Sequence, residues 1–395
     1  MTRPEMITCI EDLRQQAKRR VPRMFYDYVD SGAYTEATYR ANERDLARLG
    51  FVQRVGRNIT GRRLESQILG APVRMPLALA PTGLAGMQCA DGEILAARAA
   101  RDFGIPFTLS TVSICSIEDV AAATASPFWF QLYVMKDRGF IERLVGRARA
   151  AGCTALVVTV DLQVQGQRHK DILNGLSTPP KPSLRNLINL ATKPRWCLGM
   201  LGTKRRSFGN IVGHVSGVSD VTSLAGWVAE QFDQTLTWED IGWLRRIWDR
   251  KLIVKGVMTA EDAQAAVDQG ADAVIVSNHG GRQLDGAPSS ISALPAIVAK
   301  IGSQAEVHID GGIRSGQDLL RVRALGAHAA HIGRPFLYGL GAMGETGVRR
   351  CLEIIHRELD ITMALCGQTD IAQVDASILA AADLPAGFPH TPLTD

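Results

Sequence analysis

The stretch SNHGGRQLD, residues 277–285, places a histidine and an arginine three positions apart, directly after the apolar run 273–276. Two glycines separate them, and glycine allows a loop to turn sharply enough to present both side chains to one small molecule. A histidine titrates near neutral pH and can act as a base, and an arginine offers a planar fork to a carboxylate. His279 and Arg282 therefore suggest proton removal from a small acid, although a loop histidine alone is usually structural.

Three further residues favour the catalytic interpretation. Asp161 ends another apolar run and could hydrogen-bond an imidazolium, raising its pKa and leaving a stronger base. Lys255 follows the apolar residues LIV, where a buried lysine is costly unless it meets something anionic. The alternative for Lys255 is a side chain that extends to the rim of the fold. Arg168 supplies a second cation for a carboxylate.

These residues follow short apolar, β-branched runs that recur eight times along the chain and predict strands. The runs span residues 75–81, 105–110, 128–133, 155–161, 252–256, 273–278, 306–311 and 329–333. Segments with apolar residues at helical spacing lie between them, for example 91–103, 137–151 and 259–269. Eight alternations of strand and helix predict an α/β fold, a (β/α)8 TIM barrel with an N-terminal helical extension and a long insertion after strand 4. In such barrels the chemistry lies at the carboxyl ends of the strands.

The turns after the last two strands are rich in glycine and carry arginines. Asp310, Gly311, Gly312 and Arg314 follow strand 7, and Gly333 and Arg334 follow strand 8. Backbone N–H groups at a helix N-terminus, together with guanidinium groups, predict a phosphate site. The alternative is that the glycines only close tight turns.

The composition limits the class of protein. Hydrophobic residues make up 46% and charged residues 21% of the 395 residues, so the chain can bury a large core, which we expect to form one domain over 1–395. The seven cysteines are scattered and never form a CxxC pair, which predicts reduced thiols and no metal site. The chain shows no signal-peptide core and no apolar stretch of about 18 residues, so we expect neither secretion through a cleaved signal nor a membrane span.

One segment stands apart in charge. Residues 172–219 contain no Asp or Glu, but they contain seven Lys and Arg residues from Lys181 to Arg206, mixed with Leu, Ile, Met, Trp196 and Phe208. This pattern is typical of an interfacial segment at an anionic membrane surface. A solvated basic loop or a contact between subunits is the alternative. We expect no nucleic acid partner, because no binding motif accompanies the charge.

The chain resembles the FMN-dependent α-hydroxy-acid oxidising enzymes. The resemblance rests on PRMFYDYVDSGA (22–33), LAPTGLAGM (79–87), FQLYV (130–134), TVD (159–161), LIVKG (252–256), SNHGGRQLD, DGGIRSG (310–316) and IGRPFLYGL (332–340). These stretches lie in order over nearly the whole chain. SNHGGRQLD is highly specific to the family, whereas the phosphate turns are not.

The resemblance implies a role for each matching residue. His279 is the base and Asp161 its partner; Arg282, Arg168 and Tyr28 hold the substrate carboxylate, Tyr133 binds the hydroxyl, and Lys255 stabilises the reduced flavin. The residues implied to line the isoalloxazine ring are Ala80, Pro81, Thr82, Gly83, Ser110, Gln131 and Thr159. The residues implied to bind the ribityl phosphate are Asp310, Gly311, Gly312, Arg314, Gly333 and Arg334.

Two positions discriminate within the family. Gly83 and Val112 stand where the glycolate oxidases resemble one another in having Ala and Trp, which implies a wider substrate pocket and a dehydrogenase; neutral drift is the alternative. The resemblance favours a bacterial membrane-associated L-lactate dehydrogenase that passes electrons to a quinone or cytochrome. It also implies a homotetramer in the cytoplasm, peripheral on the inner face of the membrane.

Several alternatives remain open. Within the family they are an L-mandelate dehydrogenase and an oxidase that uses O₂. The residue types do not decide between hydride transfer and a carbanion. A nucleotide or isoprenoid phosphate enzyme on the same barrel, such as an inosine monophosphate dehydrogenase or a flavin-dependent isomerase, is a further alternative. Inosine monophosphate dehydrogenase needs a loop cysteine that NHGGRQLDGAPSS lacks. A non-catalytic flavin-binding module would have no reason to keep Tyr28, Tyr133, Asp161, His279 and both arginines together.

Overall fold

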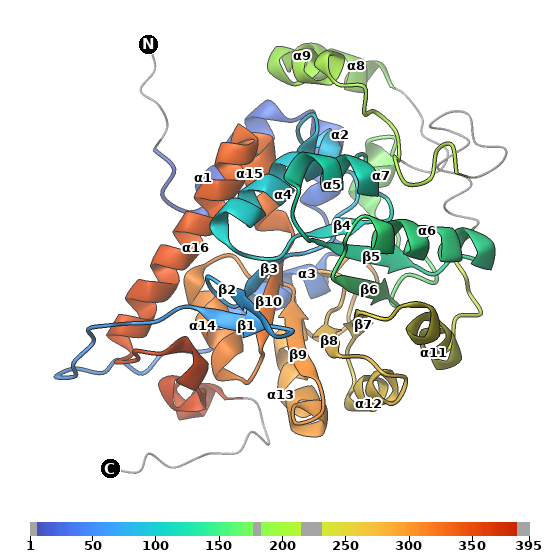
Figure 1. Cartoon of the computed structure of the whole chain (residues 1–395). Coiled ribbons are helices and arrows are strands. Elements are labelled where there is room, and N and C mark those ends of the chain that lie inside the picture. Colours follow the sequence, from blue (N-terminus) through green and yellow to red (C-terminus); the bar gives the residue numbers. More distant parts are fainter. Residues whose placement is uncertain (1–5, 177–182, 215–230, 385–395) are drawn as a thin grey trace.

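The structure is a computed structural model that describes residues 6–176, 183–214 and 231–384. Eight parallel strands form one sheet, with hydrogen-bonded neighbours in the order β3, β10, β9, β8, β7, β6, β5, β4. An isolated parallel bridge between Leu79 and Phe107 joins the two end strands and completes the ring. The prediction of a (β/α)8 barrel is therefore confirmed (Figure 1).

All eight strands lie within or overlap the predicted apolar runs. They are β3 (Leu77–Leu79), β4 (Thr108–Ser110), β5 (Trp129–Tyr133), β6 (Ala155–Thr159), β7 (Lys251–Val257), β8 (Ala273–Val276), β9 (Glu306–Asp310) and β10 (Ala329–Ile332). Most of their residues are buried, because helices cover the outer face and side chains fill the interior. The polar residues that follow each strand are therefore gathered at one end of the barrel.

A helix follows each barrel strand on the outside of the ring (Figure 1). These helices are α4 (Gly92–Phe103), α5 (Ile117–Thr124), α6 (Arg138–Ala150), α11 (Trp238–Ile247), α12 (Ala260–Asp268), α13 (Ser290–Ile301), α14 (Gly316–Ala324) and α15 (Arg334–Met343). Side-chain caps fix several starts: Asp137, Thr259 and Ser315 each accept a hydrogen bond from a backbone N–H of the first turn. The last helix, α16 (Glu345–Leu365), packs against α14, α15 and α4.

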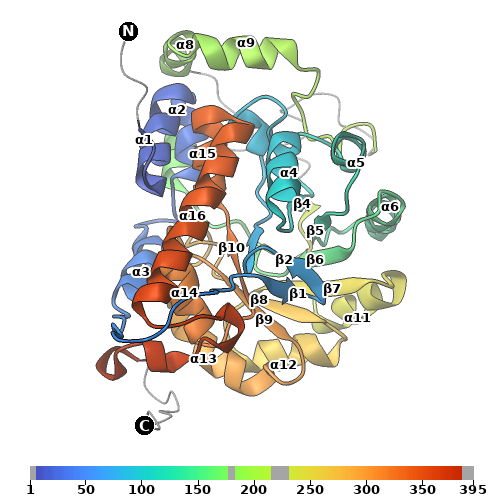
Figure 2. The same ribbon diagram turned by 60° about the vertical axis from the view of Figure 1, so that its left-hand side comes forward.

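The N-terminal extension is helical, as predicted. It comprises α1 (Ile10–Arg20), α2 (Arg23–Val29) and α3 (Ala37–Ala47), and α1 packs along α15 (Figure 2). A short antiparallel hairpin that was not predicted, β1 (Ser66–Ile68) and β2 (Ala71–Val73), precedes the barrel. Its residues Ile68 and Val73 pack against side chains of the barrel interior.

The basic insertion, 172–219, begins within α7 (His169–Leu173) and contains α8 (Leu184–Ala191) and α9 (Pro194–Gly202). Helices α8 and α9 have no buried residue and form an outlying layer beyond α2 and α4 (Figures 1 and 2). Lys181 and residues 215–219 of the predicted segment lie outside the described residues. Among the described residues, no helix is long and apolar enough to cross a membrane.

Candidate active site

His279 and Asp161 meet where strands β8 and β6 end. The imidazole Nδ1 lies 2.8 Å from Oδ1 of Asp161. His279 adopts a left-handed backbone conformation with φ of 57°, and its backbone N–H donates a hydrogen bond to Oγ of Ser277 at 3.1 Å. Gly256 makes room for the carboxylate, because a Cβ on that residue would lie 2.7 Å from Cβ of Asp161. The predicted histidine–carboxylate pair is present.

The pKa values of this pair show which protonation states the site favours. Burial lowers the pKa of His279, and the charges of Lys255 and Arg282 also lower it. Asp161 raises this pKa, but the lowering effects are larger, so the pKa lies below its ordinary value. The expected upward effect of Asp161 on this pKa is present, but burial outweighs it, so the net pKa is lowered. Burial pushes the pKa of Asp161 upward, but the charges of His279 and Lys255 hold it below its ordinary value. His279 is thus a neutral base beside an anionic carboxylate near neutral pH.

The ring of Tyr28, from α2, lies close to two guanidinium groups. The Cζ of Arg282 is 4.7 Å and the Cζ of Arg168 is 5.7 Å from the ring centroid. Arg282 also donates to the backbone carbonyl of Ser31 at 3.2 Å, and Arg168 pairs with Asp171 at 3.1 Å. The structure thus brings together the three residues predicted to hold a carboxylate.

Two cations this close disfavour each other's charge. Burial and the charge of Arg168 together lower the pKa of Arg282 to about 10, although Tyr28 and Asp171 act in the opposite direction. Burial raises the pKa of Asp171 above its ordinary value, although the charges of Arg282 and Arg168 act to lower it. An anion between the guanidinium groups would relieve the repulsion, as expected of a carboxylate site.

Tyr133 ends β5 on the same side of the barrel. Its ring packs edge-to-face against Phe232, with centroids 5.5 Å apart. Burial raises the pKa of the Tyr133 hydroxyl, and the charge of Asp161 raises it further. The hydroxyl therefore stays protonated and can donate a hydrogen bond to a ligand.

Lys255, in β7, is buried, with 4% of its surface exposed, so the alternative of a side chain reaching to the rim is wrong. Its Nζ lies 3.2 Å from Oδ2 of Asp310 and donates to Oγ of Ser277 at 2.8 Å. Burial lowers the pKa of Lys255, but Asp310 and Asp161 outweigh it and the pKa is raised. Lys255 is thus a fixed buried cation, whereas Oδ1 of Asp310 is buried without a partner among the described residues.

A row of polar side chains crosses the neighbouring strands β4, β5 and β6, beside β7, which carries Lys255. Ser110 donates to Oε1 of Gln131 at 3.0 Å, and Nε2 of Gln131 donates to Oγ1 of Thr159 at 3.0 Å. The loop after β3 includes Ala80, Pro81 and Thr82, and at Gly83 it comes close to Val112 and Tyr28. A Cβ on Gly83 would lie 2.8 Å from Cγ2 of Val112 and 3.3 Å from the hydroxyl of Tyr28. Gly83 and Val112 thus touch each other beside the carboxylate site.

The turn after β9 needs its glycines. Gly311 and Gly312 have φ of 98° and 81°, in the left-handed region that favours glycine. A Cβ on Gly312 would lie 2.3 Å from the carbonyl oxygen of Asn42 in α3. Gly333 is different, because a Cβ there would make only ordinary contacts, the nearest at 3.5 Å.

The two arginines of the phosphate turns contact the N-terminal extension. Arg314 pairs with Glu43 at 2.8 Å. Arg334 donates to the carbonyl groups of Val29 at 3.0 Å and Ser31 at 2.7 Å. The extension therefore forms one wall of the site.

Several residues that no single motif assigned a role also build the site. Ser277 joins Lys255 to the backbone of His279. The side-chain amides of Asn42 and Asn278 exchange two hydrogen bonds of 2.9 and 2.8 Å, which tie α3 to the loop after β8. Ser277 and Asn278 stand inside the specific motif, which was a usable signal, whereas nothing in the sequence marks Asn42 or Phe232.

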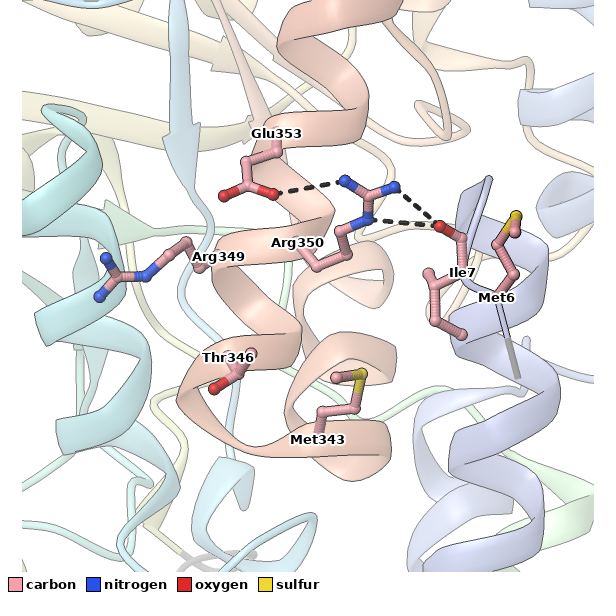
Figure 3. A pocket seen from close by; sticks show the side chains of 7 residues that line it. All are labelled: Met6, Ile7, Met343, Thr346, Arg349, Arg350 and Glu353. Atoms are coloured by element: carbon pink, nitrogen blue, oxygen red, sulfur yellow. Dashed lines mark hydrogen bonds and ion pairs between the residues drawn. The ribbon is translucent and has the colours of Figure 1, made fainter. Parts of the chain in front are cut away.

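A separate pocket of about 330 Å³ lies between the start of α16 and the segment before α1. Figure 3 shows it lined by Met6, Ile7, Met343, Thr346, Arg349, Arg350 and Glu353. Arg350 is committed to the carbonyl group of Ile7 and to Glu353. None of the lining residues belongs to the predicted site, so this pocket is not the candidate active site.

Comparison with known proteins identifies the class. The model of the FMN-dependent dehydrogenase family matches residues 17–381. The chain therefore belongs to this family, it is an enzyme, and its cofactor is FMN. The buried cation of Lys255, the partnerless Asp310 oxygen and the left-handed glycine turn fit such a cofactor, because they offer a charge, an acceptor and close backbone approach.

Individual relatives are similar over nearly their whole length. The L-lactate dehydrogenase of Caulobacter vibrioides is 46% identical over 377 residues, 95% of this chain and 98% of the relative. The L-lactate dehydrogenase of Pseudomonas syringae pv. syringae is 46% identical and matches 95% of this chain and 99% of its own length. The crystal structure of a monotopic membrane protein, (S)-mandelate dehydrogenase, superposes with a TM-score of 0.91 at 38% identity, covering 95% of this chain and 100% of that one.

Proposed function

We propose that this protein is an FMN-dependent dehydrogenase that oxidises an L-2-hydroxy acid, with L-lactate favoured, to the 2-keto acid. The observation that carries the proposal is the joint placement of a base and an anion site. The His279–Asp161 pair and the two arginines about Tyr28 lie on neighbouring loops at one end of the barrel.

Each side chain has a definite task in the proposed reaction. Arg282, Arg168 and Tyr28 bind the carboxylate and so orient the α-carbon. Asp161 occupies Nδ1 of His279, which leaves Nε2 to take up the proton, and the anionic carboxylate then stabilises the imidazolium. Tyr133, held protonated, donates a hydrogen bond to the substrate hydroxyl. FMN, when bound, supplies the acceptor for the two substrate electrons.

Other residues would hold the cofactor. Lys255 would supply a positive charge to stabilise the negative charge of the reduced ring. The row of Ser110, Gln131 and Thr159, with the Ala80–Gly83 loop, would line the ring, and Gly311, Gly312, Arg314, Gly333 and Arg334 would bind the phosphate. Asp310 suits a ribityl hydroxyl better than the phosphate, because a carboxylate repels an anion but accepts a hydrogen bond from a hydroxyl.

L-Mandelate is the second candidate substrate. The L-lactate dehydrogenases support lactate through 46% identity, whereas the mandelate enzyme supports mandelate through a TM-score of 0.91 at 38% identity. The glycine at position 83 beside Val112 favours a roomy pocket, which accepts either acid. Greater sequence similarity favours lactate.

The insertion supports a docking function at a membrane. Helices α8 and α9 carry apolar side chains that each expose more than half of their surface, which is unusual for a soluble protein. These side chains are Leu184 (73% exposed), Leu187 (63%), Ile188 (60%), Leu198 (68%) and Leu201 (70%). Arg185, Arg195 and Lys204 are exposed around them and would face anionic lipid.

The insertion is also tied to the body of the enzyme, which limits the charge available for lipid. Trp196 stacks on Phe25 with ring centroids 5.4 Å apart and donates to the carbonyl group of Met87. Arg205 pairs with Asp91 and Asp119 at 3.1 and 2.8 Å. Fewer than the seven predicted cations therefore remain for a membrane, and apolar contact carries more of the binding than the sequence suggested.

The remaining parts of the proposal follow from this docking. A dehydrogenase held on the cytoplasmic face of the membrane can pass electrons to a quinone or a membrane cytochrome. We also propose a homotetramer, by resemblance to the family.

The experiment that tests the proposed function is turnover of the FMN-loaded enzyme with a soluble quinone analogue. L-Lactate, D-lactate, L-mandelate and glycolate are compared at equal concentration. We expect rapid turnover with L-lactate and little with D-lactate or glycolate. Turnover with none of the four acids would contradict the proposal.

A further inference from the structure

The amide of Gln283, which no catalytic role has so far used, is fully occupied by one loop. Oε1 accepts a hydrogen bond from the N–H of Gly166 at 3.0 Å. Nε2 donates to the carbonyl groups of Asp161 at 2.7 Å and Val164 at 2.8 Å. A single side chain thus holds three backbone groups of the loop that follows β6.

This loop and the loop of Gln283 carry the opposite halves of the site. The loop after β6 carries Asp161 near its start and leads to Arg168, whereas Gln283 follows Arg282 directly and lies four residues after His279. The two backbones also touch, since a Cβ on Gly166 would lie 2.6 Å from the carbonyl oxygen of Gln283. The Gln283 amide therefore fixes the distance between the two loops at the point where the base and its carboxylate must meet.

We propose that Gln283 is a positioning residue, which sets Asp161 against His279 and Arg168 against Arg282 by tying the two loops together. This inference rests on the proposed function for its catalytic consequence. Gln is the residue type suited to the task, because only an amide offers two donor hydrogens and an acceptor on one short fork. A carboxylate at this position would face two carbonyl oxygens, and an aliphatic side chain would leave all three backbone groups unpaired.

The test compares Gln283→Met, which keeps the length of the side chain, with Gln283→Glu, which keeps one acceptor. We expect both to retain FMN, because the phosphate turns are on other strands. We expect kcat/KM for L-lactate to fall on the order of 10-fold or more, mostly through a higher KM, because a small misplacement of binding groups is costly. Gln304→Ala, which removes a surface amide bonded to Gln264, is the matched control and should leave kcat/KM unchanged.

A second readout separates positioning from simple stabilisation. Asp161 raises the pKa of His279, so loosening Asp161 should lower that pKa and move the acidic limb of kcat/KM to lower pH in Gln283→Met, which adds no charge of its own. An NMR titration of the His279 imidazole should show the same shift without any substrate. Variants that lose only thermal stability, with the KM and the His279 pKa of the wild type, would overturn the proposal. If the wild type oxidises no hydroxy acid, the proposed function fails, but the NMR titration still decides the role of Gln283.

Discussion

Asp161 and His279 are 118 residues apart in the chain, yet a 2.8 Å hydrogen bond joins their side chains. Two different strands deliver them, and a glycine of a third strand leaves the space in which the carboxylate sits. The pair shows how a barrel builds a site from distant segments, because all strand ends meet on one face. It also defines which nitrogen of the imidazole remains available for chemistry.

Replacing His279 by Ala should leave an FMN-bound protein that has lost its base. We expect turnover with L-lactate to fall by a factor on the order of 10² or more, as is usual when a general base is removed. The measurement is steady-state turnover at a matched flavin content. Retained activity would show that His279 is not the base.

Replacing Asp161 by Asn should change the pH dependence as well as the rate. The rate depends on neutral His279, so kcat/KM rises with pH through the pKa of that group. Asp161 raises this pKa, so the Asn variant should show its acidic limb at lower pH. We also expect its maximal rate to fall on the order of 10²-fold, because the imidazolium is no longer stabilised by a carboxylate. An acidic limb that moves to higher pH would refute the assigned electrostatics.

Gly83 should control the size of the substrate that fits. In Gly83→Ala the new methyl group would lie 2.8 Å from Cγ2 of Val112 and 3.3 Å from the Tyr28 hydroxyl, so it must displace one of them or narrow the pocket. We expect kcat/KM for L-mandelate to fall on the order of 10-fold more than for L-lactate. Gly146→Ala, in α6 with nothing within 4 Å, is the control. An equal loss with both acids would mean that Gly83 does not set substrate size.

The outlying helices should govern membrane binding. Changing Leu184, Leu187, Leu198 and Leu201 to Ser removes exposed apolar area without touching the barrel, and we expect sedimentation with anionic liposomes to be lost while turnover with a soluble acceptor persists. Val55→Ser, at an 82% exposed position elsewhere, serves as the control. Unchanged sedimentation of the quadruple variant would exclude α8 and α9 as the docking surface.

The sequence predicted the barrel and the site for a physical reason. Eight apolar runs can be recognised because both faces of each strand are buried, and polar residues after them must share one end of the barrel. Asn42 and Phe232 could not be predicted, because their roles come from packing between distant elements rather than from local pattern. The net pKa of His279 was also out of reach, since the depth of burial that lowers it is not visible in residue order.

The charge of the insertion illustrates the same limit. Seven cations in one segment suggested a cationic face directed at an anionic membrane surface. The structure turns Arg205 inward onto Asp91 and Asp119, residues that precede Arg205 by 114 and 86 positions in the chain. A count of charges along the sequence cannot reveal such pairing.

Anaerobic reduction of the bound flavin tests the central claim most directly. The purified enzyme is mixed with L-lactate or L-mandelate without oxygen, the loss of flavin absorbance is followed, and air or a soluble quinone analogue is then admitted. We expect fast bleaching by L-lactate, slow reoxidation in air and fast reoxidation by the quinone. Bleaching by neither acid would contradict hydroxy-acid oxidation, and rapid reoxidation in air would contradict the assignment as a dehydrogenase.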